Sequence, residues 1–252
     1  MNTSVVGILH PGHMGAAIAA QLVTNGHTVL WCPDGRSTAT AHRAEHAGLD
    51  PVPLVDLLRQ SRVVLSICPP AAAEDVATDV AHVGYNGIYV DANAISPART
   101  HRITARLTEA GAEVIDGCIF GPPPGEHPPA RLYLAGPESA RFRVADLLIG
   151  TLAEPAHLGG QLGQASAVKM AFVCYQKASR VLAALAHALA DDLDATEALL
   201  AEAERMPRDT SPITTACPVW PLGRGAGPQR CTRSPTPCAH SSCPRTSLLR
   251  PQ

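Results

Sequence analysis

A glycine-containing turn near the N-terminus has the residue types that hold a phosphate. The stretch GILHPGHMG places Gly12 and Gly15 between a β-branched apolar run and an alanine-rich stretch. Glycine lets a backbone approach a pyrophosphate closely, and a helix N-terminus offers free N–H groups to an anion. The pattern predicts a dinucleotide-binding turn made by Gly12, His13, Met14 and Gly15, although His10 replaces the first glycine of the usual fingerprint. The alternatives are a tight turn without a ligand and, for His10 and His13, the role of turn residues rather than catalysts.

The loop after the second apolar run carries both residue types that select between nicotinamide cofactors. Its sequence CPDGRS contains Asp34, which suits a ribose 2′-hydroxyl or a turn cap, and Arg36 with Ser37, which suit a 2′-phosphate. We expect NADP to be the cofactor, with NAD as the alternative.

Lysine is rare in this chain, which makes its two positions informative. Twenty residues are Lys or Arg, and only Lys169 and Lys177 are lysines. Arginine stays charged in proteins, whereas a desolvated lysine can release its proton and act as a general acid or base. Lys169 is therefore a candidate titratable amine on an apolar helix. The alternative is that both lysines only extend from a core helix to solvent.

Short apolar runs alternate with helical stretches over the first 155 residues. The predicted strands are residues 4–9, 28–32, 63–67, 87–91, 113–116 and 131–135. The predicted helices are residues 16–23, 38–47, 72–82, 97–110 and 138–150. This alternation predicts an α/β fold, a Rossmann-like doubly wound parallel sheet with helices on both of its faces.

The pattern changes in the last third of the chain. From about residue 162 only helical periodicity remains, in stretches at 163–190 and 194–205. Residues 207–252 carry six Arg and one Asp, a net charge of +5, against 14 basic and 21 acidic residues, a net of −7, before them. We therefore expect an NAD(P)-binding Rossmann domain at 1–155, a partial all-helical domain at 156–206 and a disordered Pro/Arg/Cys-rich tail at 207–252.

The overall composition argues against several classes of partner. A net charge of −2 gives no basis for binding nucleic acid, and neither a spanning apolar run nor a secretion signal is present. Cys32, Cys68, Cys118 and Cys174 sit singly within apolar stretches, as reduced core cysteines do, which favours the cytoplasm. The cysteines of the tail lack CxxC spacing, and no metal site is predicted. The expected partner is a small-molecule substrate, without nucleic acid or membrane.

Motifs in the first half of the chain resemble those of the β-hydroxyacid dehydrogenase and 6-phosphogluconate dehydrogenase superfamily. The glycine turn at 12–15 resembles that family's G-N-M-G turn. Cys68, Pro69 and Pro70 resemble its cofactor-contacting L-P loop. The segment at 91–97 (DANAISP) is similar to its D-x-S-T-x-x-P motif.

Two further motifs extend this likeness into the second half of the chain. Residues 116–123 (DGCIFGPP) look like the family's D-A-P-V-S-G stretch, and Lys169 falls where the family carries its catalytic lysine. The likeness spans about residues 4–205. It is greatest for the phosphogluconate dehydrogenase-like NAD(P)-binding branch, which has its own helical C-terminal domain.

The resemblance implies an NAD(P)-dependent dehydrogenase or reductase acting on a CH–OH group of a small hydroxy or oxo acid. Lys169 would then take or return the hydroxyl proton, and Asn93 would contact both substrate and cofactor. Gly121, Pro122 and Pro123 would wall the substrate side, because proline fixes the shape of a loop; a rigid surface connector is the alternative.

Two departures from the family keep a second interpretation open. Phe172 and Val173 stand where the superfamily places an asparagine after its lysine, and the helical pattern stops near residue 205. The alternative is a catalytically impaired dinucleotide-binding protein, a truncated or frame-shifted family member. The incomplete helical domain leaves open whether this chain forms a homodimer.

Overall fold

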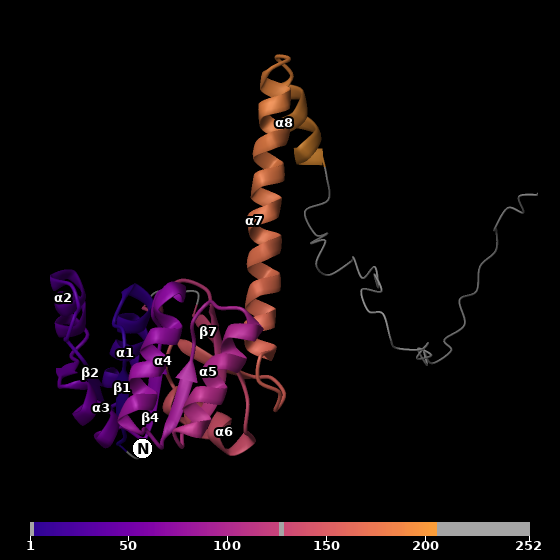
Figure 1. Cartoon of the computed structure of the whole chain (residues 1–252). Coiled ribbons are helices and arrows are strands. Elements are labelled where there is room, and N and C mark those ends of the chain that lie inside the picture. The colour runs from indigo at the N-terminus through magenta and orange to yellow at the C-terminus, as the bar shows by residue number, and fades with distance from the viewer. Residues whose placement is uncertain (1–2, 126–128, 206–252) are drawn as a thin grey trace, which may run out of the picture. The chain divides into compact units, whose positions relative to one another are not determined.

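The computed structural model describes residues 3–125 and 129–205 (Figure 1). The described residues up to Asp192 form one compact unit, and those from Leu193 onward belong to a second. The predicted tail at 207–252 lies outside the described residues.

The first unit is built on one eight-stranded sheet in the order β3-β2-β1-β4-β5-β6-β7-β8. The strands are β1 (Val5–Ile8), β2 (Thr28–Trp31), β3 (Asp50–Pro51), β4 (Val63–Ser66), β5 (Ile88–Asp91), β6 (Glu113–Phe120), β7 (Ala130–Ala135) and β8 (Ala153–His157). Neighbouring strands pair in parallel except β6 and β7, which are antiparallel. The strand order reverses between β1 and β4, the place where open α/β sheets bind ligands at the carboxyl ends of their strands.

Helices cover both faces of this sheet. They are α1 (His13–Thr24), α2 (Thr38–His46), α3 (Leu54–Gln60), α4 (Ala73–Val83), α5 (Pro97–Glu109) and α6 (Glu138–Leu147), with a 3₁₀ turn, η1, at Pro70–Ala72. One apolar cluster joins α1, α2 and α6 to the sheet, and a second joins α3, α4 and α5 to its other face. Val63 and Leu65 enter the first cluster and Val64 enters the second, as the alternation of side chains along a strand requires.

Two anchoring contacts hold the last part of this unit together. Arg141 of α6 is 9% exposed and donates from Nε to the Gly136 carbonyl at 2.9 Å and from Nη1 to the Leu158 carbonyl at 2.7 Å. A guanidinium that serves two backbone acceptors satisfies groups that would otherwise be buried without a partner. This side chain therefore ties α6 to the segments that flank β7 and β8.

The predicted α/β Rossmann-like fold is confirmed, with differences in detail. The strand predicted at 113–116 continues to Phe120, and β7 runs antiparallel to it rather than extending a wholly parallel sheet. The elements β3, α3 and β8 were not predicted. Cys32, Cys68 and Cys118 are buried, but Cys174 is exposed, so its prediction as a core cysteine was wrong.

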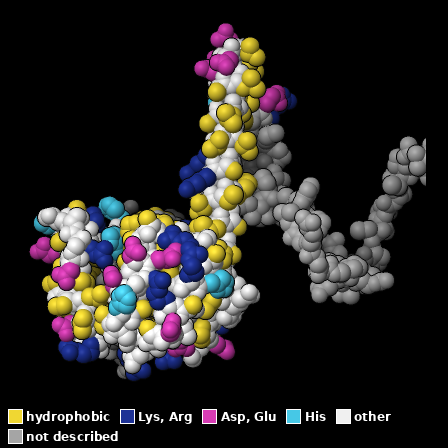
Figure 2. All heavy atoms as spheres, in the orientation of Figure 1, with side chains coloured by type: hydrophobic (Ala, Val, Ile, Leu, Met, Phe, Trp, Pro, Cys, Tyr) yellow, Lys and Arg dark blue, Asp and Glu magenta, His cyan; other side chains and the backbone are white. Residues whose placement is uncertain are grey.

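A long helix, α7 (Gln164–Asp191), follows the sheet, and α8 (Thr196–Arg205) lies in the second unit. In the first turn of α7 Ala165 and Ser166 are buried, whereas apolar side chains farther along it are exposed, among them Leu182 at 66% and Leu185 at 62% (Figure 2). The helical C-terminal region predicted after the sheet is therefore present. Its boundaries at 156 and 206 stay a prediction. No helix among the described residues is long and apolar enough to cross a membrane.

Candidate functional site

The glycine turn joins β1 to α1 at the switch point of the sheet. Gly12 is the N-cap of α1. Because glycine has no side chain, the N-cap supplies no side-chain acceptor to the first N–H groups of the helix. A Cβ on Gly15 would lie 2.4 Å from the His10 carbonyl oxygen, whereas a Cβ on Gly12 would meet only the His10 ring at 3.4 Å. Gly15 is thus required by the backbone of the turn. Gly12 is not required by contacts within the turn, because a Cβ there would meet the His10 ring at ordinary contact distance.

A basic cluster stands beside this turn, at the carboxyl end of β2. Arg36 donates from Nη1 to His10 Nδ1 at 3.3 Å, and its Nε is buried without a hydrogen-bond partner among the described residues. Burial, together with the charges of Arg36 and Arg43, lowers the pKa of His10. The ring is therefore neutral at pH 7 and accepts the guanidinium hydrogen bond. An orphaned Nε in a cationic cluster fits an anionic ligand group.

The neighbouring residues of this loop have different surroundings. Ser37 is the N-cap of α2, where its Oγ accepts the Thr40 N–H at 3.3 Å. Arg43 donates from Nη2 to Thr40 Oγ1 at 3.1 Å and from Nε to the Pro11 carbonyl at 3.4 Å, so it bridges α2 to the glycine turn. Asp34 is exposed. Arg43 was missed by the sequence reasoning, because only the register of α2 brings it beside Arg36.

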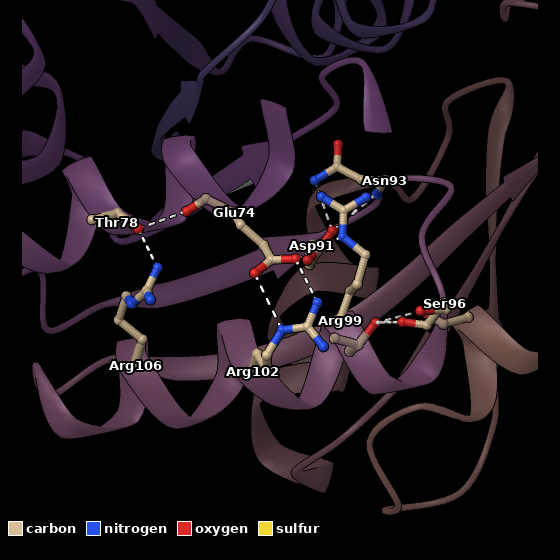
Figure 3. Close-up of polar contacts among 10 residues, drawn as sticks. Glu74, Thr78, Asp91, Asn93, Ser96, Arg99, Arg102 and Arg106 are labelled. Carbon is tan, nitrogen blue, oxygen red and sulfur yellow. Dashed lines mark hydrogen bonds and ion pairs between the residues drawn. The ribbon is translucent and has the colours of Figure 1, made fainter. Parts of the chain in front are cut away.

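Asn93 lies at the carboxyl end of β5 and is 2% exposed (Figure 3). Its Oδ1 accepts the Cys68 N–H at 2.7 Å, and its Nδ2 donates to Asp91 Oδ1 at 2.7 Å and to Ser66 Oγ at 3.1 Å. The side chain thus binds the end of β4 to the end of β5 and fixes the loop at Cys68, whereas Pro69 and the following proline are exposed. Its contact with a substrate or cofactor stays a prediction.

Asp91 is the most strongly perturbed carboxyl group of this network. It is 1% exposed, and its Oδ2 has no hydrogen-bond partner among the described residues. Burial raises the pKa of Asp91 to about 7, against hydrogen bonds from Asn93 that favour the charged form. Its register partner on β6 is Asp116, whose negative charge adds to this shift.

An ion-pair cluster ties the two helices that follow β4 and β5. Glu74 of α4 accepts from Arg99 Nε at 2.7 Å and from Arg102 Nη2 at 2.8 Å (Figure 3). These two hydrogen-bonded guanidinium groups lower the pKa of Glu74 to about 2. Arg99 also lies near enough to Asp91 to oppose the rise of its pKa. The cluster stabilises the α4–α5 pair beside the carboxyl edge of the sheet.

Lys169 lies on the second turn of α7, against the carboxyl end of β6. Its Nζ donates to the Ile119 carbonyl at 2.6 Å and lies 4.6 Å from the centroid of the Phe120 ring. The side chain is half-buried, and this burial lowers the pKa of Lys169. Phe172 packs edge-on against Phe120, with ring centroids 5.1 Å apart. The residue that replaces the family's asparagine therefore supports the aromatic ring beneath the amine.

The loop that follows β6 lies beside Lys169 at this edge of the sheet. Gly121, Pro122 and Pro123 are exposed, and Gly121 has φ of +101°, a conformation that favours glycine. The loop leaves β6 directly beyond Ile119 and Phe120, the two residues that contact Lys169. Its predicted place on the substrate side stays a prediction. Among the residues that the structure describes, no group of His, Cys, Asp and Glu is arranged to hold a metal ion.

Comparison with known proteins connects this geometry to a family. The sequence profile of the NAD-binding domain of 6-phosphogluconate dehydrogenase matches residues 4–159. The mitochondrial 3-hydroxyisobutyrate dehydrogenase of Drosophila melanogaster is 23% identical over 168 residues, which are 66% of this chain and 52% of that protein. The chain thus spans about half the length of this curated relative.

Solved structures share the same fold. A conserved protein of unknown function, described as structurally similar to 3-hydroxyacid dehydrogenases, superposes with a TM-score of 0.67 at 26% identity, covering 80% of this chain and 76% of its own. The 3-hydroxyisobutyrate dehydrogenase of Mycobacterium tuberculosis, solved with L-serine, gives a TM-score of 0.66 at 21% identity, covering 77% and 67%. Each of these likenesses covers more than three quarters of this chain.

Proposed function

Because this chain belongs to the family defined by the NAD-binding domain of 6-phosphogluconate dehydrogenase, we propose that it is an NAD(P)-dependent oxidoreductase acting on a small hydroxy or oxo acid. The position of Lys169 carries the proposal. Its amine lies 2.6 Å from the Ile119 carbonyl at the carboxyl end of β6, at the same edge of the sheet as the glycine turn. Such an edge is where ligands bind in this class of fold.

NADP is the cofactor that the residues around β2 fit best. The N-terminus of α1 at Gly12 would hold the pyrophosphate, and Arg36 with Arg43 would hold a 2′-phosphate. The orphaned, buried Nε of Arg36 supports this assignment. The exposed carboxylate of Asp34 is the feature that would instead favour NAD through a ribose hydroxyl. When bound, the nicotinamide supplies or accepts the hydride.

Lys169 would act as the general acid and base. Partial burial favours its neutral form, which takes a proton from a substrate hydroxyl; its protonated form returns the proton in the reverse direction. The Ile119 carbonyl accepts one N–H and so orients the amine, and the Phe120 ring stabilises the charged form from below. The remaining hydrogens of the ammonium have no acceptor among the described residues and would meet a substrate oxygen.

Two further groups would complete the site. Asn93 would hold the loop at Cys68 in place for the cofactor and, from the end of β5, approach the substrate. Gly121, Pro122 and Pro123 would form the wall beside Lys169, because prolines keep the loop rigid and remove N–H donors.

The test combines binding and turnover. Thermal-shift titrations with NADPH and NADH are expected to raise the melting temperature, NADPH at lower concentration, and Arg36→Ala is expected to abolish that preference. A panel of hydroxy and oxo acids is then assayed by nicotinamide absorbance with Lys169→Ala and the control Lys177→Ala. We expect Lys169→Ala to reduce kcat by about 10²–10⁴-fold and Lys177→Ala to leave it unchanged. Equal activity of Lys169→Ala and the parent chain would refute the role of the lysine.

The exposed apolar side chains of α7 favour a second candidate, a dinucleotide-binding protein without turnover. Val181, Leu182 and Leu185 are each more than half exposed, and yellow hydrophobic side chains run along this helix in Figure 2. Surfaces of this kind belong against other protein segments. Cofactor-induced stabilisation with no turnover on any acid of the panel would support this candidate over the first.

A further inference from the structure

The N-terminus of α7 is capped by a carboxylate from a different element. Asp116 of β6 is fully buried, and its Oδ2 accepts the Ala165 N–H at 2.9 Å. The Ser166 N–H lies 3.2 Å from both carboxylate oxygens, and Ser166 Oγ donates to Oδ1 at 2.6 Å. The N-cap residue, Gly163, supplies no side chain of its own. Asp116 therefore does for this helix what an N-cap side chain does elsewhere.

The capped turn is held from a second side. Ser166 Oγ lies 2.7 Å from Thr100 Oγ1 of α5, so the serine hydroxyl joins β6, α5 and α7 at one buried point. Ala165 and Ser166 are at most 1% exposed, whereas the helix is largely exposed after its second turn. The position of α7 is thus set at this turn.

The same strand contacts α7 again, one helical turn later. Lys169 is three residues after Ser166, and its acceptor, Ile119, is three residues after Asp116. Residues three or four apart lie on one face of a helix. Strand β6 therefore holds α7 at two points, the Asp116–Ser166 contact and the Ile119–Lys169 contact. The first contact fixes the helix and so determines where the lysine amine lies along β6.

We propose that Asp116 is a positioning residue, which fixes the first turn of α7 and thereby holds the Lys169 amine against the Ile119 carbonyl. The proposal rests on the proposed function of Lys169. Asp116 acts through the helix and does not touch the reacting atoms. Releasing the first turn would free the lysine side chain into solvent and separate it from the carboxyl edge of β6.

The electrostatics of the turn agree with this role. Burial raises the pKa of Asp116, while the hydrogen bonds from Ser166 and Ala165 favour its charged form, as does the positive end of the helix dipole. The titratable groups that face the first turns of α7 are Asp116 and Cys118 from β6, Tyr133 from β7 and His101 from α5. Burial raises the pKa of the Cys118 thiol to about 12, so this neighbour carries no charge near pH 7.

The decisive variant is Asp116→Asn in the full-length chain. An amide of the same shape turns an NH₂ group towards the N–H donors of the helix and so weakens the cap. The chain has only two lysines, so the pH dependence of acetylation by acetic anhydride can be followed separately for Lys169 and Lys177 by peptide mass spectrometry. In the variant, we expect the midpoint for Lys169 to move to higher pH and the profile of Lys177 to stay unchanged.

The direction of this shift separates positioning from a direct charge effect. Removing a nearby negative charge would move the Lys169 midpoint to lower pH, whereas exposing the amine to water moves it to higher pH. A downward shift, or no shift, would overturn the proposal. Glu113→Gln is the matched control, because it removes a carboxylate from the same strand that pairs with Arg143 and not with α7; it is expected to leave the Lys169 profile as it is.

Two further measurements complete the test. Ser166→Ala removes one hydrogen bond of the cap and leaves the backbone donors; it is expected to move the Lys169 midpoint in the same direction by less, and it carries the test if Asp116→Asn does not fold. If the chain turns over an acid of the panel, kcat of Asp116→Asn is expected to fall at least about tenfold with the dissociation constant of NADPH unchanged. Because the amine profile needs no turnover, failure of the proposed activity and failure of the positioning role give different results.

Discussion

We expect Asp91 to make the stability of this protein fall as the pH rises, the reverse of the effect of a carboxylate held in an ion pair. Its carboxyl group is 1% exposed at the end of β5, and burial raises its pKa from an ordinary 3.8 to about 7. Between these values the folded protein keeps the proton and the unfolded chain does not. Stability therefore falls as the pH rises through this interval, because the folded state binds more protons than the unfolded state.

The size of the effect follows from the shift. Each pH unit well inside the interval between the two pKa values changes the free energy of unfolding by about 1.4 kcal/mol, and the slope flattens near the folded pKa, so the change from pH 5 to pH 7 is roughly 2 kcal/mol. Above pH 7 the contribution levels off. His10 acts in the opposite direction: its pKa is lowered in the folded protein, so below pH 6.5 the unfolded chain binds this proton more readily and stability rises with pH. A variant is needed to separate the two.

The variant Asp91→Asn removes the ionisable carboxyl group and so isolates its contribution to the pH dependence of stability. The amide keeps the oxygen that accepts the two Asn93 hydrogen bonds and removes the titration. Urea unfolding of both proteins at pH 5 and pH 8 gives the free energy of unfolding, and the difference between the proteins cancels His10. We expect the variant to gain roughly 3 kcal/mol relative to the parent between these pH values, whatever its absolute stability. A difference that is the same at pH 5 and pH 8 would refute a raised pKa at Asp91.

Three other predictions concern stability. Gly15→Ala is expected to cost about 1–3 kcal/mol and to weaken NADPH-induced stabilisation, because its Cβ meets a backbone oxygen at 2.4 Å; Gly12→Ala should unfold like the parent chain in urea. Arg141→Met is expected to cost about 2–3 kcal/mol by leaving two carbonyls unpaired, against under about 1 kcal/mol for the exposed Arg143→Met, as measured by urea unfolding. Because its pKa is lowered to about 2, Glu74 contributes stability above about pH 4.5 that is lost as the pH falls towards 2. In Glu74→Gln the melting temperature should therefore fall less steeply between pH 4.5 and pH 2 than in the parent chain, and an equal fall would contradict this.

The parts of the fold that could be predicted are those whose signal is local. The strands β1, β2, β4 and β5 are short runs of β-branched and aliphatic residues, and α1, α2 and α4 between them were predicted as well, whereas α3 was not. By contrast, β3 consists of two exposed residues and β8 reads AEPAH, so neither has the composition of a strand. Their pairing is decided by the neighbouring strand rather than by their own residue types.

The same division applies to the candidate site. The glycine turn is visible in the sequence because the requirement for Gly15 arises within six residues of chain. The Asp116–Ser166 contact joins residues 50 positions apart, and no local sequence pattern around either residue predicts it. Likewise, Phe172 is only a departure from the family pattern in the sequence. The structure explains this residue by its ring contact with Phe120.

The capping of α7 at one end has a consequence for the helix as a whole. Its first turn is tied to two neighbouring elements, whereas its later turns are rich in alanine and depend on the intrinsic preference of the chain for helix. We therefore expect amide hydrogens near Ser166 to exchange only when the sheet opens, and those beyond Val181 to exchange through fraying of the helix itself. Two parts of one continuous helix are thus expected to open by different routes, and Lys169 lies in the part that the sheet protects from exchange.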